Sequence, residues 1–591
     1  MKKTKLLSLL LAVAMVAGLF AGCSNTTETP SQAPATQAPE SQAPAPETQA
    51  PAPSGTFDLS VCIASEPQTI DPALNSAVDG AVMTQHMFEG LMKWVDNGVG
   101  VEDATINYAE LVPGQAASYD KVVHEADDPE KGITAGMVTY TFHLRDDIKW
   151  SDGKPVTAGD FEYAWKRLVD LETAADYRNM ASSVVGYNEI SDGTAAADTL
   201  MAKAIDDKTF QVTLYTDLPY FLELCAFPAL LPIREDTIAA NGDQWTFSPE
   251  TYLTNGAYKM SEWVHNQKIV MVKNDQYYDY ANLGPDSITF TLTDDQNAML
   301  AGFRSNELQF IEDMPVDEIA TLLSTGELKI IPYLGTYYVC YQNEKAPFDD
   351  WRVRKAFTLA INSQYIVDYV TQTGQIPANG WVPSGISDAE PNSDFRANGG
   401  AYWEAPTTDE IYQKNLAEAN KLLDEAGYTD RSTFPVVEYL YNTSDNHKAI
   451  GEALQQQWQE GLGVTVTLKN QDWSVFLETR KQGDYQIARN GWINDYNDPM
   501  GFLDMWLTGG GNNDAQYANP DYDALIQKAL STSDAAERMQ AMHDAEDLII
   551  GQDWALGPIY FYTQKYMMQD NVGGVYYTPL GFFFFMYATQ K

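Results

Sequence analysis

The chain has 591 residues, which is too long for one hydrophobic core and predicts two or three packed units. Hydrophobic residues make up 44% of it, enough to fill such cores. Its 37 Lys and Arg residues are outnumbered by 82 Asp and Glu residues, so the formal net charge is -45. A charge of this sign and size repels nucleic-acid phosphates and anionic lipid surfaces, which excludes both as partners.

The first residues have the pattern of an export signal. Three lysines precede an apolar run, Leu6–Ala21, which is shorter than the roughly 20 residues that a membrane span needs. Cys23 follows directly after Ala-Gly, and this arrangement resembles the bacterial lipoprotein box. The resemblance implies that residues 1–22 are a signal peptide and that Cys23, lipidated with palmitate, becomes the mature N-terminus. The protein is then expected outside the cytoplasm, held by its lipid at the outer face of the cytoplasmic membrane or on the periplasmic side.

A tether is predicted to follow the lipid anchor. Residues 24–55 are rich in Gln, Ala, Pro, Ser and Thr and contain no aromatic residue. Such a segment cannot bury enough apolar surface to fold. We therefore predict that residues 23–55 form a lipidated, disordered spacer and that the folded body begins near Thr56.

Strand patterns begin directly after the tether. Phe57–Ile63, Val138–Leu144 and Phe210–Leu214 alternate in polarity as half-buried strands do. From residue 436 onward the pattern predicts, in order, a strand Val436–Tyr441, a helix Asn446–Glu460, a strand Val464–Leu468, a helix capped by Asp472 and ending at Lys481, and a strand Tyr485–Gly491. This alternation predicts an α/β fold with a parallel or mixed sheet and right-handed crossovers.

The segment A-R-N-G-W-I-N-D-Y-N-D-P, residues 488–499, lies at the carboxyl end of the last of these strands. Ligands of open α/β sheets gather at such ends. Two acids, Asp495 and the distant Glu66, would face a cation, whereas Arg489, Arg480 and His447 would face an anion. A ligand with an ammonium at one end and a carboxylate at the other would use both sets, and a free peptide is such a ligand.

Each of these residues also has an ordinary structural role. Asp495 would be solvated in an acidic surface loop, and Arg480 would pair with a neighbouring acid, Glu478 or Asp484. A lone histidine such as His447 is more often structural than ligand-binding. Trp492 would belong to the core. The pattern alone favours these ordinary roles.

Enzyme motifs are absent from the sequence. It lacks G-x-S-x-G, H-E-x-x-H, a P-loop and a G-x-G-x-x-G after a strand. The six histidines form no i, i+4 pair, and Cys62, Cys225 and Cys340 form no C-x-x-C pair. We predict no catalytic residue, no metal site, no cofactor and three buried thiols. Paired carboxylates for glycoside hydrolysis remain open, since 82 acidic residues offer many accidental pairs.

Longer motifs carry a family resemblance. They are S-E-P-Q-T-I-D-P (65–72), F-E-G-L (88–91), Y-T-F-H-L-R-D-D-I-K-W-S-D-G-K-P-V-T-A-G-D-F-E-Y-A-W-K-R-L (140–168), N-G-A-Y-K-M (255–260), A-P-F-D-D-W-R-V-R-K-A-F (346–357) and Y-A-N-P-D-Y-D-A-L-I (517–526). From about Ile63 to Ala588 the chain resembles the oligopeptide-binding lipoproteins of ABC transporters, within solute-binding family 5, which also serves dipeptides and nickel. Three segments are similar to the oligopeptide branch: Y-N-T-S-D-N-H-K (441–448), Q-D-W-S-V-F-L-E-T-R-K-Q-G (471–483) and residues 488–499.

The resemblance implies a role for each candidate residue. Asp495 would hold the α-ammonium of the peptide. The carboxylate of short peptides would meet Arg480, Arg489 and His447. The cleft would be lined by Trp473, Trp492, Tyr177 and Glu66. Backbone groups near Gly491 and Ile493 would pair with the ligand as with an added strand, which recognises peptides without regard to sequence.

The resemblance also implies an α/β, bilobed periplasmic-binding-protein fold of type II, in the large class with an extra subdomain. Mixed sheets would be flanked by helices, and two strands would form a hinge. Lobe I would comprise residues 56–78, 237–334 and 560–591, the inserted subdomain residues 79–236, and lobe II residues 335–559. The chain would cross between the lobes near Leu334 and Tyr560.

The function implied by the resemblance is binding without catalysis. A monomer would capture short peptides between its lobes and deliver them to a membrane permease driven by cytoplasmic ATPases. The alternatives are a binder of another solute (dipeptide, nickel or oligosaccharide, the last suggested by 13 Trp and 34 Tyr), an extracellular hydrolase, and a receptor for signalling peptides. The region 96–137 is longer and more acidic than the family pattern, and the preferred peptide length stays open.

Overall fold

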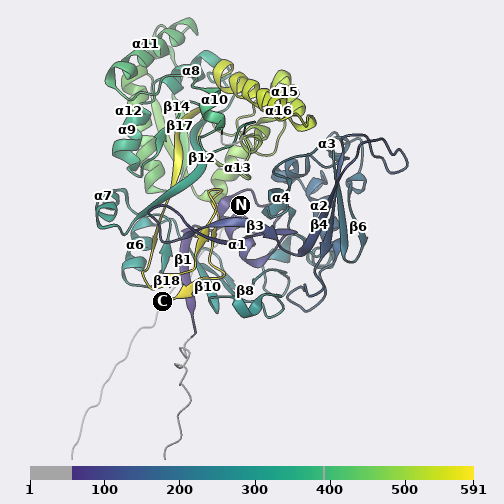
Figure 1. Ribbon diagram of the computed structural model, residues 1–591. Helices are drawn as coiled ribbons and strands as arrows, with labels where there is room; N and C mark the ends of the chain where they lie inside the picture. Colours follow the sequence, from purple (N-terminus) through teal and green to yellow (C-terminus); the bar gives the residue numbers. More distant parts are fainter. Residues whose placement is uncertain (1–55, 391–392) are drawn as a thin grey trace, which may run out of the picture. The chain divides into compact units, whose positions relative to one another are not determined.

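The computed structural model describes residues 56–390 and 393–591. The predicted signal peptide, Cys23 and the tether lie outside these ranges, and Thr56–Lys591 forms a unit of its own. Its sheets contain both parallel and antiparallel pairs, and helices flank them (Figure 1). The predicted α/β class with mixed sheets is confirmed.

The largest sheet has eleven strands. Ten of them follow one another in the order β15-β14-β16-β12-β17-β11-β1-β10-β9-β8, and β13 pairs with β17 beside this path. The strands are β1 (Asp58–Ala64), β8 (Tyr258–Val264), β9 (Lys268–Lys273), β10 (Ser287–Leu292), β11 (Phe310–Ile311), β12 (Lys329–Tyr341), β13 (Ile376–Pro377), β14 (Val437–Asn442), β15 (Val466–Gln471), β16 (Ile487–Ile493) and β17 (Leu556–Met568).

Two long strands, β12 and β17, join the two parts of this sheet (Figure 1). Their antiparallel ladder shifts register between Pro332 and Thr336. On one side of the shift β17 pairs with β11, and on the other side β12 pairs with β16. The predicted crossing near Leu334 falls in the register shift, and the one near Tyr560 falls within β17. These strands occupy the place expected of a two-strand hinge.

The predicted alternation of strands and helices from residue 436 is confirmed. β14 lies parallel to both β15 and β16, and the intervening helices are α12 (Asp445–Leu462) and α13 (Trp473–Lys481). α12 buries Leu454 and Trp458, and the Trp458 indole N–H donates to the carbonyl of Phe357 at 2.8 Å. Asp472 is the N-cap residue of α13, as predicted, but its side chain makes no capping hydrogen bond.

The other sheets are smaller. One has the order β2-β3-β19-β20, a second β4-β5-β7-β6, and a third β18-β21. Their strands are β2 (Met92–Gly100), β3 (Asn107–Pro113), β4 (Ala116–Val123), β5 (Val138–Leu144), β6 (Ala202–Asp206), β7 (Thr209–Leu214), β18 (Val572–Gly573), β19 (Tyr576–Tyr577), β20 (Phe583–Phe584) and β21 (Thr589–Gln590). The strands predicted at the start of the body therefore form, as β1, β5 and β7.

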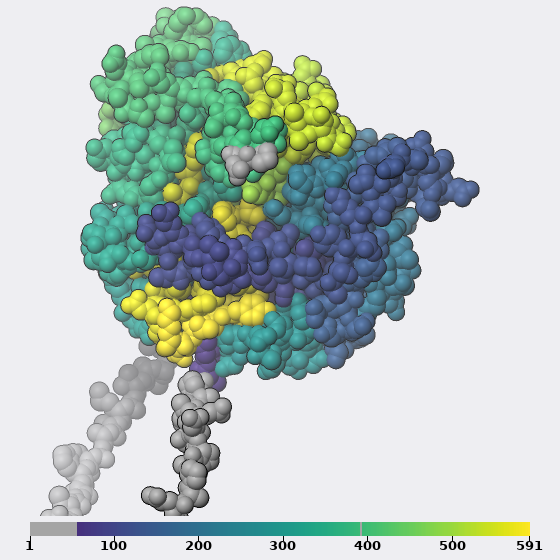
Figure 2. Space-filling model, viewed as in Figure 1, coloured from purple at the N-terminus to yellow at the C-terminus, as the bar shows by residue number. Residues whose placement is uncertain are grey.

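Sheet pairing divides residues 79–236, which the sequence analysis assigned to one inserted subdomain. β2 and β3 join the C-terminal strands β19 and β20, whereas β4 to β7 form a sheet of their own. In Figure 2 the purple residues near position 100 form a band beside the yellow C-terminal residues. The boundaries of the lobes and the subdomain stay predictions.

The remaining helices cover the sheets, and none of those in the described ranges is long and apolar enough to cross a membrane. Cys62, Cys225 and Cys340 are buried and unpaired, as predicted. The helices are α1 (Val78–Met87), α2 (Ala158–Val169), α3 (Tyr187–Ser191), α4 (Phe221–Leu224), α5 (Glu235–Asn241), α6 (Gln296–Arg304), α7 (Val316–Thr325), α8 (Trp351–Leu359), α9 (Ser363–Tyr365), α10 (Phe395–Gly399), α11 (Asp409–Glu425), α14 (Met500–Leu503), α15 (Pro520–Ser531) and α16 (Ala535–Glu546).

Candidate functional site

A cavity of about 390 Å³ lies at the carboxyl end of β16, where open α/β sheets hold ligands. Its walls come from β16, the loop after it, α12 and α13, and also from the start of α1 and a 3-10 helix, η1 (Asp176–Ala181). Of the ten ligand residues predicted from the sequence, nine line this cavity: Tyr177, His447, Trp473, Arg480, Arg489, Gly491, Trp492, Ile493 and Asp495. The roles predicted for them stay proposals.

Glu66 is the predicted residue that the structure places elsewhere. Its neighbour Ser65 lines the cavity, but Glu66 does not. The Glu66 carboxylate instead contacts His265 Nδ1 at 2.6 Å and accepts a hydrogen bond from the backbone N–H of Asn266 at 2.8 Å. Asn266 has a positive φ of 57° in the turn between β8 and β9, so Glu66 holds that turn rather than facing a ligand.

Asp495 is nearly buried, with 9% of its surface exposed. Its Oδ1 accepts a hydrogen bond from the hydroxyl of Tyr177 at 2.9 Å, whereas the buried Oδ2 has no hydrogen-bond partner in the described chain. Burial raises the pKa of Asp495 well above the usual carboxyl range, and the nearby Asp504 raises it further. A dry carboxylate oxygen without a partner favours a cation, because a charged donor would compensate its lost hydration.

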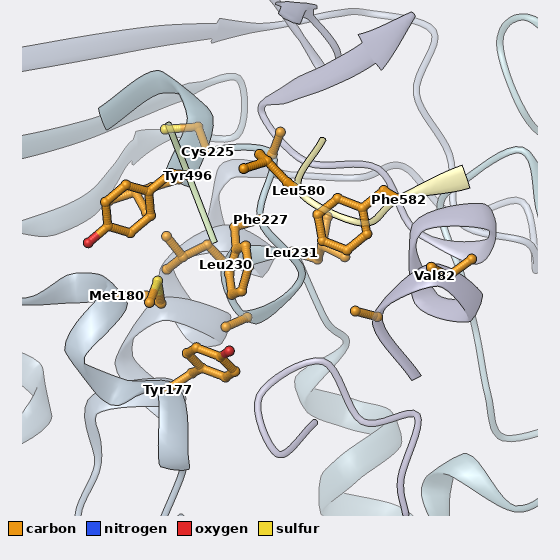
Figure 3. Close-up of a cluster of buried hydrophobic side chains, with 14 of the residues drawn as sticks. Val82, Tyr177, Met180, Cys225, Phe227, Leu230, Leu231, Tyr496, Leu580 and Phe582 are labelled. Atoms are coloured by element: carbon orange, nitrogen blue, oxygen red, sulfur yellow. The ribbon is translucent and has the colours of Figure 1, made fainter. Parts of the chain in front are cut away.

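An apolar cluster beside the cavity includes Tyr177, the residue that donates to Asp495 (Figure 3). The rings of Tyr177 and Phe227 lie edge to face with centres 5.2 Å apart, and Leu580 and Phe582 from the C-terminal region lie near them. Phe227, Leu580 and Phe582 also line the cavity. Residues more than 300 positions apart therefore form an apolar wall of this cavity.

The loop that carries Asp495 is fixed by a buried ion pair. Arg538 of α16 donates to both oxygens of Asp498 at 2.7 Å, and these two residues are 4% and 3% exposed. Tyr496 stacks on Tyr220 with ring centres 4.2 Å apart. The loop is thus tied both to α16 and to the residue before α4.

Arg489 offers a positive charge on another wall. Within the described ranges no carboxylate oxygen lies within 4.0 Å of its guanidinium, and its buried Nε has no hydrogen-bond partner. The guanidinium carbon lies 5.5 Å from the ring centre of Tyr337 and 5.8 Å from that of Trp473. His447 lies close by, with Nδ1 3.3 Å from the hydroxyl of Tyr337. Burial lowers the pKa of His447 well below its usual value, and Arg489 lowers it further, so the ring is neutral at pH 7.

Arg480 has internal partners. Its Nε lies 3.2 Å from a carboxylate oxygen of Asp514, and its guanidinium also donates to the side-chain oxygen of Asn490. The pairing differs from the ordinary role considered from the sequence, in which Glu478 or Asp484 would be the partner. Arg480 lines the cavity, but its charge is already matched.

The edge of β16 is open beside the cavity. β16 pairs with β12 along its length, whereas its pairing with β14 ends at Ala488. Within the described chain no strand continues along that edge from Arg489 to Ile493. At Gly491 an added Cβ would come 2.3 Å from the hydroxyl oxygen of Tyr562, so a larger residue there would force the Tyr562 side chain to move. An extended ligand could pair with this edge, where the Gly491 backbone N–H at present donates to the side-chain oxygen of Asn490 at 2.8 Å.

Several lining residues carry no sequence signal that we recognised. Asp79 lies in the first turn of α1, where acids are common because they oppose the helix dipole. Glu312 follows β11, accepts a hydrogen bond from Gln564 at 3.1 Å, and has its pKa raised to about 8 by burial. Tyr562 belongs to β17. Asp79, Glu312 and Tyr562 come close to the β16 residues only in the folded chain. The described residues contain no group of three or more acids, histidines or cysteines placed to hold a metal ion.

Comparison with known proteins places the chain in a family. Residues 110–514 match the model described as bacterial extracellular solute-binding proteins, family 5 Middle. The periplasmic oligopeptide-binding protein OppA of Salmonella typhimurium is 36% identical over 515 residues, covering 86% of this chain and 88% of the relative. The oligopeptide-binding protein OppA of Bacillus subtilis is 33% identical over 552 residues, covering 91% and 93%.

Solved structures of similar fold support the same family assignment. Haemophilus influenzae OppA, in complex with RPPGFSPFR, matches with a TM-score of 0.80 at 31% identity, covering 90% of this chain and 99% of that chain. The family model and these relatives each span well over half of the chain. The chain therefore belongs to the bacterial extracellular solute-binding proteins of family 5.

Proposed function

We propose that this protein captures short peptides with free amino termini and delivers them to the permease of an ABC importer. The unpartnered, nearly buried Oδ2 of Asp495 carries this proposal, because a cationic donor could bind it inside a cavity large enough for a ligand. The relatives named as oligopeptide-binding proteins support the same ligand class. The protein changes no bond in its ligand.

Three parts of the site would each bind a different part of the peptide backbone. Asp495 would accept hydrogen bonds from the α-ammonium, and Arg489, which has no carboxylate partner in the described ranges, would meet the carboxylate with His447 as a neutral neighbour. The open edge of β16 would pair with the peptide between them. Trp473, Trp492 and Tyr177 would form the side walls, and Arg480 would position Asn490 instead of binding the ligand.

Placement in the cell follows from the N-terminal sequence. The proposal includes removal of residues 1–22, lipidation of Cys23 and a tether that keeps a monomeric body near a membrane outside the cytoplasm. The two lobes would close on the peptide by rotation at β12 and β17. The closed body would then dock on the permease, which cytoplasmic ATPases drive.

The proposal is tested by calorimetric titration of the purified chain with trialanine, N-acetyl-trialanine and a cello-oligosaccharide. Trialanine is expected to bind with micromolar or tighter affinity, about -8 kcal/mol or more favourable. The acetylated peptide is expected to bind far more weakly, and the sugar not at all. Binding of the sugar alone would assign the protein to another solute class, and breakdown of any of the three would make it a hydrolase.

Closure of the cavity should depend on Gly511. Lys481 of α13 forms an ion pair with Asp176 of η1 at 2.5 Å, and beside it Gly511 packs against the backbone of Asp176. An added Cβ at Gly511 would come within 2.5 Å of the Asp176 Cα, so Gly511→Ala must push the two walls apart. We expect trialanine binding to weaken by about 1–3 kcal/mol in calorimetry.

The matched control for this variant is Gly159→Ala. Gly159 lies exposed in α2, where an added Cβ would meet its nearest atom at an ordinary 3.5 Å. Both variants should keep the unfolding temperature of the unliganded protein within a few degrees. Equal peptide affinity of Gly511→Ala and the control would show that this contact plays no part in closure.

A further inference from the structure

Three side chains of η1 contact α13 or the segment that follows β16. The contacts are Asp176 with Lys481 at 2.5 Å, the Tyr177 hydroxyl with Asp495 at 2.9 Å, and Asn179 Nδ2 with Asp504 Oδ2 at 3.1 Å. η1 lies in the predicted inserted subdomain, whereas α13 and the segment after β16 lie in predicted lobe II. Since each contact joins the two, each would be lost if they separated.

Asp504 is the most buried acid of the three, with 4% of its surface exposed. It is the first residue of a 3-10 helix, η8 (Asp504–Trp506). Its Oδ2 accepts hydrogen bonds from Asn179 and from the hydroxyl of Tyr496, the latter at 3.4 Å. Within the described ranges no Lys, Arg or His nitrogen lies within 4.0 Å of its carboxylate. The charge of an ionised Asp504 would therefore be compensated only by neutral donors.

The groups around Asp504 do not supply the missing positive charge. Arg538 is bound to Asp498. Arg178 lines a second cavity of about 410 Å³ beside Asp504 but forms no ion pair with it in the described chain. The other titratable groups that face Asp504 or this cavity are acids and tyrosines: Asp176, Asp192, Asp495, Asp523, Tyr177, Tyr187, Tyr220, Tyr496 and Tyr522. Burial, and to a smaller extent the charge of Asp498, raise the pKa of Asp504 to about 7.

The amide of Asn179 lacks a donor that a protonated Asp504 would provide. Its Nδ2 donates to Asp504, but its buried Oδ1 has no hydrogen-bond partner in the described chain. An ionised carboxylate only accepts hydrogen bonds, whereas a protonated carboxyl also donates one. A proton on Asp504 therefore suits both the absence of a cation and the free amide oxygen. Separation of η1 from Asp504 would admit water, which favours the ionised form.

We propose that the contact between Asn179 and Asp504 is pH-sensitive: a proton on Asp504 holds η1 against lobe II, so acidification favours the closed form of the protein. The inference rests on the proposed peptide function and adds a pH dependence to it. Closure takes up a proton at Asp504, so this stabilisation is complete below the usual carboxyl range and is lost as pH rises to about 7. Asp495 has the opposite effect, because it releases its proton when it binds an ammonium.

The test uses Asp504→Asn, which keeps the shape of the side chain but cannot ionise. Trialanine is titrated by calorimetry into this variant and into the unchanged protein at several pH values from about 5 to about 8. Dividing the two dissociation constants at each pH cancels the titration of Asp495 and of the other groups that both proteins share. The dissociation constant of the unchanged protein, relative to that of the variant, is expected to rise about tenfold or more across this range.

Asn179→Asp tests the other side of the contact. Two facing carboxylates repel each other once both ionise, so this variant should lose about tenfold in trialanine affinity relative to the unchanged protein across the same pH range. Asp192→Asn is the matched control, because it removes an exposed acid of the second cavity and should keep the pH profile of the unchanged protein.

The inference is overturned if trialanine binds and the ratio for Asp504→Asn stays constant across the pH range. Should that variant not fold, a pH profile of Asn179→Asp identical to that of the unchanged protein overturns it. If trialanine binds at no pH, the proposed function fails, and this inference falls with it.

Discussion

Replacing Asp495 with asparagine is expected to weaken the binding of trialanine by about 2–5 kcal/mol, which is about 30-fold or more. Asparagine keeps the size of the side chain and its hydrogen bond with Tyr177, but it removes the charge that would face the α-ammonium. Because Asp495 is 9% exposed, water cannot replace that charge. Calorimetric titration measures the change directly.

A cycle with the N-acetylated peptide assigns the effect to the ammonium. In the unchanged protein acetylation should cost a similar amount, whereas in Asp495→Asn it should cost little, since the charge pair is already absent. Asp472→Asn is the control, because Asp472 is exposed and makes no capping hydrogen bond. If the losses of binding free energy from acetylation and from Asp495→Asn simply add, the α-ammonium binds at a residue other than Asp495.

The same variant should reveal the proton on Asp495. A carboxyl whose pKa is raised on folding lowers the stability of the fold as pH rises above the usual carboxyl range, and the loss grows until the buried group itself ionises. Unliganded Asp495→Asn is therefore expected to unfold at a higher temperature than the unchanged protein, with a difference that grows with pH. Peptide binding should release a proton, which calorimetry in buffers of different ionisation enthalpy detects.

The second large effect is expected at the buried pair of Asp498 and Arg538. Arg538→Met leaves the 3% exposed carboxylate of Asp498 without its charged partner, which should cost about 3–5 kcal/mol of unfolding free energy. The loop holding Asp495 would also lose its tie to α16, so trialanine affinity should fall as well. Denaturant unfolding measures the first effect and calorimetry the second.

An exposed ion pair provides the comparison. Arg304 and Glu318 meet at 2.9 Å with 52% and 38% of their side chains exposed, so Arg304→Met should cost only about 0–1 kcal/mol. Removing both charges of the buried pair, in Arg538→Met with Asp498→Leu, should restore much of the lost stability. A loss in Arg538→Met no larger than in Arg304→Met would contradict the importance of this pair.

Local periodicity was enough to predict the parallel unit of the large sheet. β14, α12, β15, α13 and β16 appear in the predicted order because each buries one face at its own characteristic spacing. Pairing between distant segments had no such signal. The two-residue strand β19 is too short to show a period, yet its pairing with β3 determines where β2 and β3 belong.

The same contrast between local and distant segments explains which residues of the candidate site could be predicted. Asp495, Trp492 and Arg489 lie in one short segment, so their common location followed from the strand that precedes them. Glu66 was expected at the cavity, but a side chain in a loop can point either way, and Glu66 holds a turn while its neighbour Ser65 faces inward. Asp79 was missed because a first-turn acid looks like ordinary helix stabilisation until the opposite wall is known.

The shared ladder of β12 and β17 limits how the molecule can move. Backbone hydrogen bonds on both sides of the register shift at Pro332–Thr336 would have to break if the halves slid past each other or separated. A twist at the shift changes the dihedral angles of only a few residues. The ladder therefore resists sliding and allows torsion at its register shifts, so the closure proposed above would change mainly the angle between the lobes.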